Sequence, residues 1–394
     1  MRNKGVSVLL ILILVVVSFA GGWFFCRYQT TGTLTKSAFS REEIRLLNEA
    51  RGIIEAYGIE EHSSEEEITV ALKALAASLN DPYAYYYTPA ELEEYNKSST
   101  GSVEGGIGAV IYDNGGEFMI GDVYVGLTAE AAGLKKGDRI LKVNDEDVAG
   151  LTVEEVVSRV KGEPDTTVLM TVDRAGEEKN LLITRGNGQR EMTEYHMIGS
   201  VLYTRIVSFH GSAVDCFKKA LAFGEEHGYT ALIVDVRENG GGEVIQFAQI
   251  ADLLLGKGET FYALNKEGKK IETHSSDEKN KVSVPMAVLI NGNSASASEA
   301  LAGALRDLGN ARLVGTKSFG KGIMQLNVPL TNGGMFKLTT AKYYLPSGEC
   351  IQDVGLTPEG DAFIEQDPEI TAKPWTLTDD NDVQLQKALE ILTK

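Results

Sequence analysis

The sequence predicts an α/β fold, because apolar runs typical of buried strands alternate with amphipathic helices from residue 187 to the C-terminus. Residues 231–236, apolar except for one acid, and residues 286–290 have the composition of strands covered on both faces. Each run is followed by small or polar residues, and then by apolar positions spaced for one face of a helix. This alternation predicts a layered domain of helices and mixed sheets.

Composition limits the function classes. The chain has 394 residues, 43% of them hydrophobic, which is enough for two or three domains with their own cores. A formal net charge of −18 disfavours binding to nucleic acid or to anionic lipid. Cys216 and Cys350 could pair only if the fold brings them together, and free buried thiols are the alternative. No Cys/His cluster has zinc-ligand spacing, so we expect neither a metal nor a cofactor.

Residues 1–28 are predicted to form a cytoplasmic stub and one transmembrane helix. Arg2 and Lys4 precede an uncharged run over residues 5–26 that is long enough to cross a bilayer with its N-terminus inside. A secretion signal cleaved after Ala20 is the alternative, and the N-terminal residue of the mature protein would distinguish the two. The chain is therefore expected to be a single-pass cell-membrane protein with its main part extracytoplasmic, or to be secreted if the segment is cleaved.

Residues 29–98 are predicted to be a polar tether and an N-terminal helical segment. The spacing Ser40-x-x-Glu43 predicts a capping box at the start of a first helix. A second helix is expected from Ser64 through Leu79. Its expected inward-facing residues are Ile68, Ala71, Leu72 and Leu75. The tyrosines of residues 83–87 are interpreted as packing a helical segment onto a neighbouring core, in preference to forming a ligand site.

Residues 99–186 read as a separate small β-rich module. A glycine loop runs into a strand near Ile111, a second short strand is expected at residues 123–124, and Thr152-x-x-Glu155 predicts a capped helix. Two further strands are expected, at residues 167–172 and 179–184. The succession, with the stretch Ala-Gly-Leu-x-x-Gly-Asp at residues 132–138, resembles a PDZ domain.

This resemblance implies that the glycine loop binds a peptide carboxylate through backbone N–H groups, and that the peptide pairs with a sheet edge. The expected peptide-binding residues are Gly106, Ile107, Gly108, Ala109, Val156 and Val157. A PDZ-shaped spacer that binds nothing is the alternative. Binding of peptides with a free carboxylate, but not of amidated ones, would distinguish the two interpretations.

Ser296 is the candidate nucleophile of the domain at residues 187–394. It lies between the predicted strand at 286–290 and a predicted helix, where helix-terminal N–H groups can stabilise an oxyanion. A serine at this position is also a favoured N-cap, which is its purely structural interpretation.

Lys321 is the candidate base, because a serine hydroxyl needs a partner that takes its proton. Glycines on both sides allow its backbone to pass close to another element, and Gln325 could hold its amine. An ordinary lysine has a pKa of about 10.4, so a base would need a water-poor site that lowers this pKa to roughly 7–8. An exposed surface lysine is the alternative.

The stretches at residues 294–299 (Ser-Ala-Ser-Ala-Ser-Glu) and 319–322 (Phe-Gly-Lys-Gly), together with Gln325, resemble the carboxyl-terminal processing (tail-specific) peptidases. The resemblance extends from about residue 40 to the C-terminus. It implies a crotonase-like spiral core in which Ser296 is the nucleophile, Lys321 the general base and Gln325 the residue that orients the lysine.

The glycine run at residues 240–242 gains a role from the same resemblance. Three consecutive glycines indicate a turn or a close backbone approach, a mobile loop being the alternative. The family implies an oxyanion hole built from the N–H of Gly241, or of its neighbour Gly242, and the N–H of Ala297. Gly240 stands where the family usually has proline, which predicts a looser loop. The nearby Asp235 and Arg237 are expected to pair structurally.

The most favoured function is an extracytoplasmic serine endopeptidase that uses a Ser–Lys dyad and recognises unfolded proteins or C-terminal tails through its PDZ domain. A membrane-anchored PDZ adaptor with an inactive peptidase core is one alternative, which a Ser296→Ala variant would distinguish. A Ser–His–Asp hydrolase is another, for which His210 is the histidine to test among five. Expected partners are protein or peptide substrates with free C-termini and the membrane, and a homo-oligomer is left open.

Overall fold

The structure is a computed structural model that describes residues 39–60, 62–99, 101–277, 279, 282–373 and 376–393. The chain divides into two units, residues 1–71 and 72–394, and each is described by itself. The predicted transmembrane segment lies outside the described residues. Among the described helices, none combines the length and the apolar character that crossing a membrane requires.

The first unit contains helix α2 (Arg41–Tyr57) and the beginning of α3 (Ser64–Ala77). The predicted capping box is confirmed, because Ser40 accepts a hydrogen bond from the Glu43 N–H and Glu43 accepts one from the Ser40 N–H. The expectation that Ile68 and Leu75 of α3 face inward is wrong, since their side chains are 53% and 43% exposed. Periodicity identified an apolar stripe but not a surface that covers it.

The second unit begins with the end of α3 and includes a PDZ-type module. Its strands are β2 (Ser102–Gly106), β3 (Ala109–Asp113), β4 (Phe118–Val123), β5 (Arg139–Val143), β6 (Glu146–Asp147), β7 (Thr167–Arg174), β8 (Glu177–Thr184) and β9 (Gly186–Gln189). Its helices are α5 (Thr128–Ala131) and α6 (Val153–Val160), and α6 has the predicted capping box. The strand expected at residues 123–124 is in fact the end of β4, in which Phe118 and Ile120 are buried on either side of the half-buried Met119.

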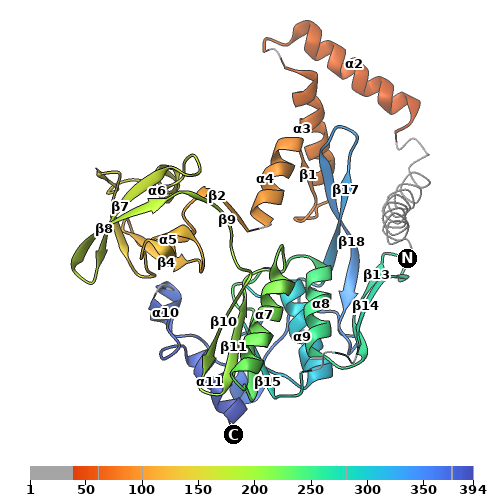
Figure 1. Ribbon diagram of the computed structural model, residues 1–394. Helices are drawn as coiled ribbons and strands as arrows, with labels where there is room; N and C mark the ends of the chain where they lie inside the picture. The colour runs from red at the N-terminus through yellow and green to blue at the C-terminus, as the bar shows by residue number, and fades with distance from the viewer. Residues whose placement is uncertain are drawn as a thin grey trace, which may run out of the picture. The chain divides into compact units, whose positions relative to one another are not determined.

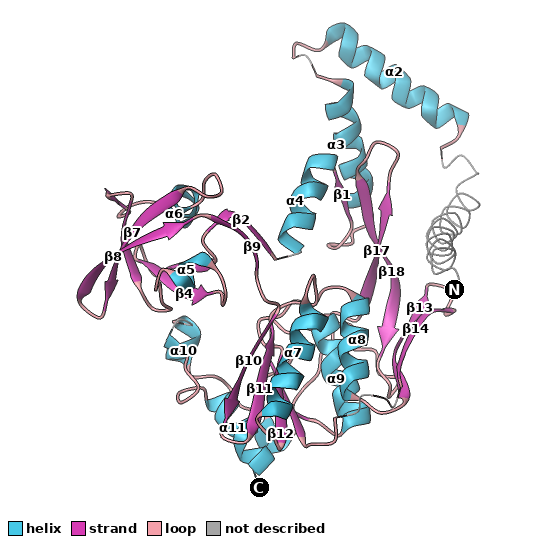
Figure 2. Ribbon diagram, viewed as in Figure 1, coloured by secondary structure: helices cyan, strands magenta, loops and turns pink. Residues whose placement is uncertain are grey.

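A five-stranded sheet forms the centre of the remaining part, in the order β10-β11-β12-β15-β16. These strands are β10 (Thr193–Ile198), β11 (Val201–Ile206), β12 (Ala231–Asp235), β15 (Met286–Ile290) and β16 (Arg312–Gly315). Strands β10 and β11 of this sheet are labelled in Figures 1 and 2. The strands from β11 to β16 run parallel, and β10 pairs with β11 in the antiparallel sense. Every residue of β12 and β15 is buried, as their continuous apolar runs predicted.

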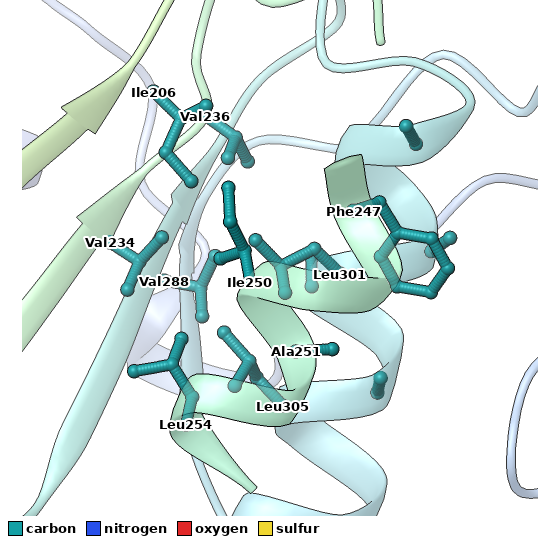
Figure 3. Packing of buried hydrophobic residues seen from close by; sticks show 14 of the residues in the cluster. Ile206, Val234, Val236, Phe247, Ile250, Ala251, Leu254, Val288, Leu301 and Leu305 are labelled. Atoms are coloured by element: carbon teal, nitrogen blue, oxygen red, sulfur yellow. The ribbon is translucent and has the colours of Figure 1, made fainter. Parts of the chain in front are cut away.

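Helices cover both faces of this sheet. Alternate residues of a strand point to opposite faces, so Val234 and Val288 pack with α8 (Val244–Leu254) and α9 (Ala297–Gly309), as Figure 3 shows. Ile233 and Leu289 lie in the opposite cluster with residues of α11 (Val383–Thr393). Helix α7 (Ala213–Glu226) joins the cluster of α8 and α9. This packing fixes the carboxyl ends of β12 and β15, from which the candidate site arises.

A second sheet contains β1 (Tyr85–Tyr87), β13 (Gly258–Asn265), β14 (Lys270–Ser276), β17 (Ile323–Pro329) and β18 (Met335–Tyr344). Tyr86 is buried as predicted, and the tyrosine-rich stretch contains a strand, β1, which pairs with β18 and was not foreseen from the sequence. The remaining elements are α4 (Pro89–Ser99), the 3-10 helix η1 (Gly360–Ala362) and α10 (Pro368–Ala372). Cys216 and Cys350 are both free thiols.

Candidate active site

Ser296 lies in a strained turn between β15 and α9. Its φ of 57° and ψ of −115° are unusual for a residue with a side chain, and such conformations cost about 1–3 kcal/mol unless the surroundings hold them. Two buried side chains do so: the Ser296 N–H donates to Glu299 Oε2 over 2.9 Å, and the Tyr343 hydroxyl donates to the Ser296 carbonyl over 3.0 Å. The turn is therefore held from both sides of the Ser296 backbone.

The two serines on either side of Ser296 attach this turn to the glycine loop after β12. Ser294 Oγ donates to the Val236 carbonyl, and Ser298 Oγ donates to the Asn239 carbonyl, each over 2.8 Å. Both flanking serines are fully buried, whereas Ser296 is half-buried. The Ser-Ala-Ser-Ala-Ser pattern thus has two buried serines that hold the loop and a half-buried one between them.

Gly241 approaches Ser296 so closely that no side chain fits there. Its φ is 102°, and a Cβ added to it would lie 2.9 Å from Ser296 Cβ and 3.0 Å from the Ala297 nitrogen. The structure therefore brings the predicted oxyanion residues Gly241 and Ala297 beside the candidate nucleophile.

The hydrogen bonds of the loop distinguish its two candidate donors. The Gly241 N–H is bonded to Asn239 Oδ1 over 2.9 Å. The Gly241 carbonyl accepts the Phe209 N–H over 3.0 Å, so the Gly242 N–H, on the other side of the same planar peptide, points away from Phe209. The Gly242 N–H is consequently the better available donor of the pair in this arrangement.

The lysine loop is bound to the serine helix by one buried carboxylate. Glu299 Oε2 accepts the Lys321 N–H over 2.9 Å, and Oε1 accepts the Gly320 N–H over 2.7 Å and the Ser318 hydroxyl. The glycines on either side of Lys321 pass close to the backbone of residues 352–355, as their sequence positions predicted. An added Cβ on Gly322 would lie 2.5 Å from the Gln352 nitrogen.

The Lys321 amine points at an aromatic ring in this structure. Its Nζ lies 4.3 Å from the centre of the Tyr83 ring, and within the described residues no hydrogen bond joins it to Ser296 Oγ. Gln325, expected to orient the lysine, donates instead to the Thr339 hydroxyl over 3.2 Å. Burial, and then the nearby Lys337, lower the pKa of Lys321, while Asp81 and Glu299 act to raise it.

Arg237 forms the expected structural pair with Asp235 and extends it. The guanidinium is nearly buried and bonds both oxygens of Asp235 and both oxygens of Asp382, which precedes α11. The Tyr203 hydroxyl also donates to Asp235. This network fixes the start of the glycine loop against the C-terminal helix.

The histidines of residues 72–394 have partners other than Ser296. His210 lies 2.8 Å from Ser208 Oγ, next to the glycine loop, and burial lowers its pKa. The others contact Asp379, the Phe223 carbonyl and Glu272; they are His196, His227 and His274. In this unit no described histidine forms a Ser–His–Asp arrangement with Ser296.

The predicted peptide-binding residues lie around β3 and α6 of the PDZ-type module. Gly108 has a φ of 81° and leads directly into β3, which is an end strand of its sheet. Ile107 and Val156 are buried in the core of the module, while Val157 and Ala109 are half-buried. The half-buried residues are therefore the ones placed to contact a ligand.

Three side chains that contact the site were given no role by the sequence reasoning: Glu299, Tyr343 and Tyr83. Glu299 could have been found, because Ser296-x-x-Glu299 has the spacing of a capping box. Tyr343 and Tyr83 could not, since they reach the site from β18 and from the segment before β1, far away in sequence.

Comparisons with known proteins agree with this organisation. Residues 200–361 match the family described as Peptidase family S41, and residues 98–173 match the PDZ domain. The segment that contains Ser296 and Lys321 is thus similar to an S41 peptidase domain, and it follows a segment similar to a PDZ domain.

Relatives and solved structures point to the same group. A "Probable CtpA-like serine protease" of Staphylococcus saprophyticus is 30% identical over 81% of this chain and 65% of its own length. The protein of that name in Staphylococcus aureus strain bovine RF122 is 31% identical over 75% of this chain and 60% of its own length. The chain thus spans less than two thirds of these relatives.

Among solved structures, the photosystem II D1 C-terminal processing protease matches with 25% identity and a TM-score of 0.51, over 83% of this chain and 94% of that one. A putative S41 protease from Bacteroides fragilis shares the fold, with a TM-score of 0.61 at 15% identity, over 85% of this chain and 92% of that one. The resemblance to carboxyl-terminal processing peptidases is confirmed.

Proposed function

We propose that the chain is an extracytoplasmic serine endopeptidase in which Ser296 and Lys321 form a catalytic dyad. The observation that carries this proposal is the Glu299 carboxylate, which binds the backbone N–H groups of both residues. A buried carboxylate shared by two loops holds their backbones at a fixed separation, so the lysine side chain is anchored within reach of the serine turn. The names of the staphylococcal relatives support the same activity.

The chemistry begins with the uncharged amine of Lys321. It takes the proton of Ser296 Oγ as that oxygen attacks a peptide carbonyl carbon, and the carbonyl oxygen becomes an oxyanion. The N–H groups of Ala297 and of the glycine loop, with Gly242 as the available donor, stabilise this charge. The lysine then gives its proton to the leaving amine. Water, activated by the same amine, hydrolyses the remaining ester and restores Ser296.

The environment of Lys321 supports a role as base. Burial is the largest cause of its lowered pKa, because a water-poor site disfavours the ammonium form. The positive charge of Lys337 acts in the same direction. At a given pH both effects increase the fraction of uncharged amine, which is the form that can accept a proton.

Under this proposal, the observed positions of the Lys321 amine and the Gln325 side chain are those of a resting state. The Lys321 amine has to leave the Tyr83 ring and approach Ser296 Oγ, and Gln325 has to exchange Thr339 for the lysine. A lysine side chain has four flexible carbons, so its amine can move while the backbone stays bound to Glu299.

The remaining parts of the proposal concern substrates and location. We propose that the PDZ domain recruits unfolded proteins or C-terminal tails, in line with the C-terminal processing named for the D1 protease. Membrane anchoring through residues 1–28, or secretion after cleavage, and a crotonase-like spiral core belong to the same proposal.

The test is digestion of an unfolded casein-type protein by the full chain and by two variants, Ser296→Ala and Lys321→Ala. Each variant is expected to lose at least about a hundredfold of the cleavage rate. Lys317→Ala is the matched control, because Lys317 is an exposed lysine of the same loop, and it should cleave normally. Cleavage by Ser296→Ala at the rate of the unchanged chain would favour a PDZ adaptor with an inactive core.

A further inference from the structure

The Lys321 amine has an unusual partner for a general base. It lies 4.3 Å from the centre of the Tyr83 ring. The face of an aromatic ring attracts an ammonium group through its quadrupole and offers no comparable attraction to an uncharged amine. The contact therefore favours the protonated form of the lysine, which is the form that cannot act as a base.

The Tyr83 ring is held in this position by the segment that precedes β1. The Tyr83 N–H donates to Asp81 Oδ1 over 3.0 Å, and Asp81 Oδ2 accepts the Thr339 N–H of β18 over 3.2 Å. Residues 85–87 then pair with residues 335–337 of the same strand. Thr339 also accepts the hydrogen bond of Gln325, so the partners of both Lys321 and Gln325 are attached to β18.

We propose that Tyr83 is a positioning residue for Lys321, whose ring holds the charged amine in a resting place that the amine must leave before it can take the Ser296 proton. The step in which the amine leaves the ring to take the Ser296 proton rests on the proposed function. The holding of the charged amine by the ring does not. Tyr83 borders a cavity of about 850 Å³, which leaves room for the ring and the amine to separate.

The charged groups around Lys321 divide into two sets. Asp81 of the Tyr83 segment and Glu299 of α9 favour the ammonium, as the ring does, and Lys337 of β18 opposes it. Burial, and then the negative charge of Asp353, raise the pKa of the Tyr83 phenol. Removal of the Tyr83 ring takes away one of the effects that favour the ammonium. A larger fraction of the Lys321 amine should then be uncharged at the same pH.

The first measurement is the titration of Lys321 in the full chain, by NMR of ¹³C-methylated lysines, with the Lys321 signal identified by its absence in Lys321→Arg. Tyr83→Leu keeps an apolar side chain without a ring, and it should give about three to ten times more uncharged amine at the same pH. Tyr83→Phe keeps the ring and should titrate like the unchanged chain. Tyr83→Trp offers a stronger ring and should give less uncharged amine.

Tyr85→Leu is the matched control, since it removes a ring two residues away that faces Lys73, at 5.6 Å, and not Lys321. It should leave the Lys321 titration unchanged. An identical Lys321 titration in Tyr83→Leu, Tyr83→Trp and the unchanged chain would overturn the inference, whatever the peptidase activity.

The second measurement is the pH dependence of Ser296 modification by a small arylsulfonyl fluoride, which does not depend on the natural substrate. In Tyr83→Leu the acid limb of this reaction should move to lower pH, by the same factor as the lysine titration. A shifted titration without Ser296 modification in any variant would support the ring contact and overturn the dyad. Failure of the ring contact and failure of the dyad therefore give different results.

Discussion

Ser296 and Lys321 donate their backbone N–H groups to the same oxygen atom, Oε2 of Glu299, each over 2.9 Å. The other oxygen, Oε1, is bonded to the Gly320 N–H and to the Ser318 hydroxyl. A fully buried carboxylate thus satisfies four donors and is satisfied by them, which avoids the cost of an unpaired buried charge. This side chain and the hydrogen bond from the Phe319 N–H to the Ser294 carbonyl together hold the two candidate catalytic residues at their separation.

Glu299→Gln should therefore impair both stability and catalysis. The amide has one acceptor oxygen, so at least one pair of N–H or O–H donors would face an NH₂ group. We expect a loss of about 1–3 kcal/mol in the free energy of unfolding and a loss of roughly 10- to 100-fold in the rate of Ser296 acylation, because small misplacements are costly. Urea unfolding and arylsulfonyl fluoride modification measure the two effects.

Glu359→Gln is the control for this variant, since Glu359 is exposed and lies outside the site. It should behave like the unchanged chain in both measurements. Full stability together with full acylation in Glu299→Gln would contradict the positioning role assigned to the carboxylate.

Two neighbouring glycines should respond in opposite ways to alanine. A Cβ on Gly241 would collide with Ser296 Cβ and the Ala297 nitrogen, whereas a Cβ on Gly240 meets nothing within 4 Å and Gly240 has no positive φ. Gly241→Ala should abolish acylation and destabilise the fold. Gly240→Ala should keep activity and raise the free energy of unfolding by about 0.4–1 kcal/mol, by restricting the unfolded chain.

Rates and thermal unfolding of the two glycine variants check this prediction together. Equal effects at both positions would mean that the loop does not approach Ser296 as described. A gain in the stability of Gly240→Ala would also support the expectation that glycine at position 240, where carboxyl-terminal processing peptidases usually have proline, makes the loop looser.

The pH dependence of acylation should follow the charges around Lys321. Lys337 lowers the pKa of Lys321, so Lys337→Gln should raise it, and the acid limb of the rate profile should move to higher pH. Activity at neutral pH should then fall, because less of the amine is uncharged. The measurement is the acylation rate as a function of pH; a limb that stays in place, or moves to lower pH, would contradict the assignment of Lys321 as the base.

The PDZ domain should bind peptides that end in a free carboxylate. Its glycine loop leads into β3, the end strand of its sheet, and α6 packs beside this strand. Peptide binding to the full chain carrying Ser296→Ala, measured by fluorescence anisotropy, should be lost when the same peptides are amidated. Equal binding of both forms would favour a spacer role for the domain.

Local patterns were sufficient to predict the parts of the site that depend on short stretches of sequence. Ser296 at a strand-to-helix turn, the close approach of the glycines around Lys321, and the buried strands β12 and β15 all follow from residue order and spacing. The capping spacing Ser296-x-x-Glu299 was also visible. What the spacing did not reveal is that the Glu299 carboxylate reaches a loop more than twenty residues away.

Contacts between distant segments could not be predicted from the sequence. Tyr83 reaches Lys321 from the segment before β1, which pairs with β18, and Tyr343 reaches Ser296 from β18, which pairs with β13. No local periodicity reports these pairings. The same limit explains why strand β1 was not foreseen, and why α3 was given an inward face. Long-range pairing overrides local propensity in such segments.

The most direct measurement of the central claim is the site and the lysine dependence of covalent modification by an arylsulfonyl fluoride. Peptide mass spectrometry of the full chain should place the adduct on Ser296 in the unchanged protein and in Lys317→Ala, and should find none in Lys321→Ala. An adduct on another residue, or modification of Ser296 at the same rate without Lys321, would contradict the dyad.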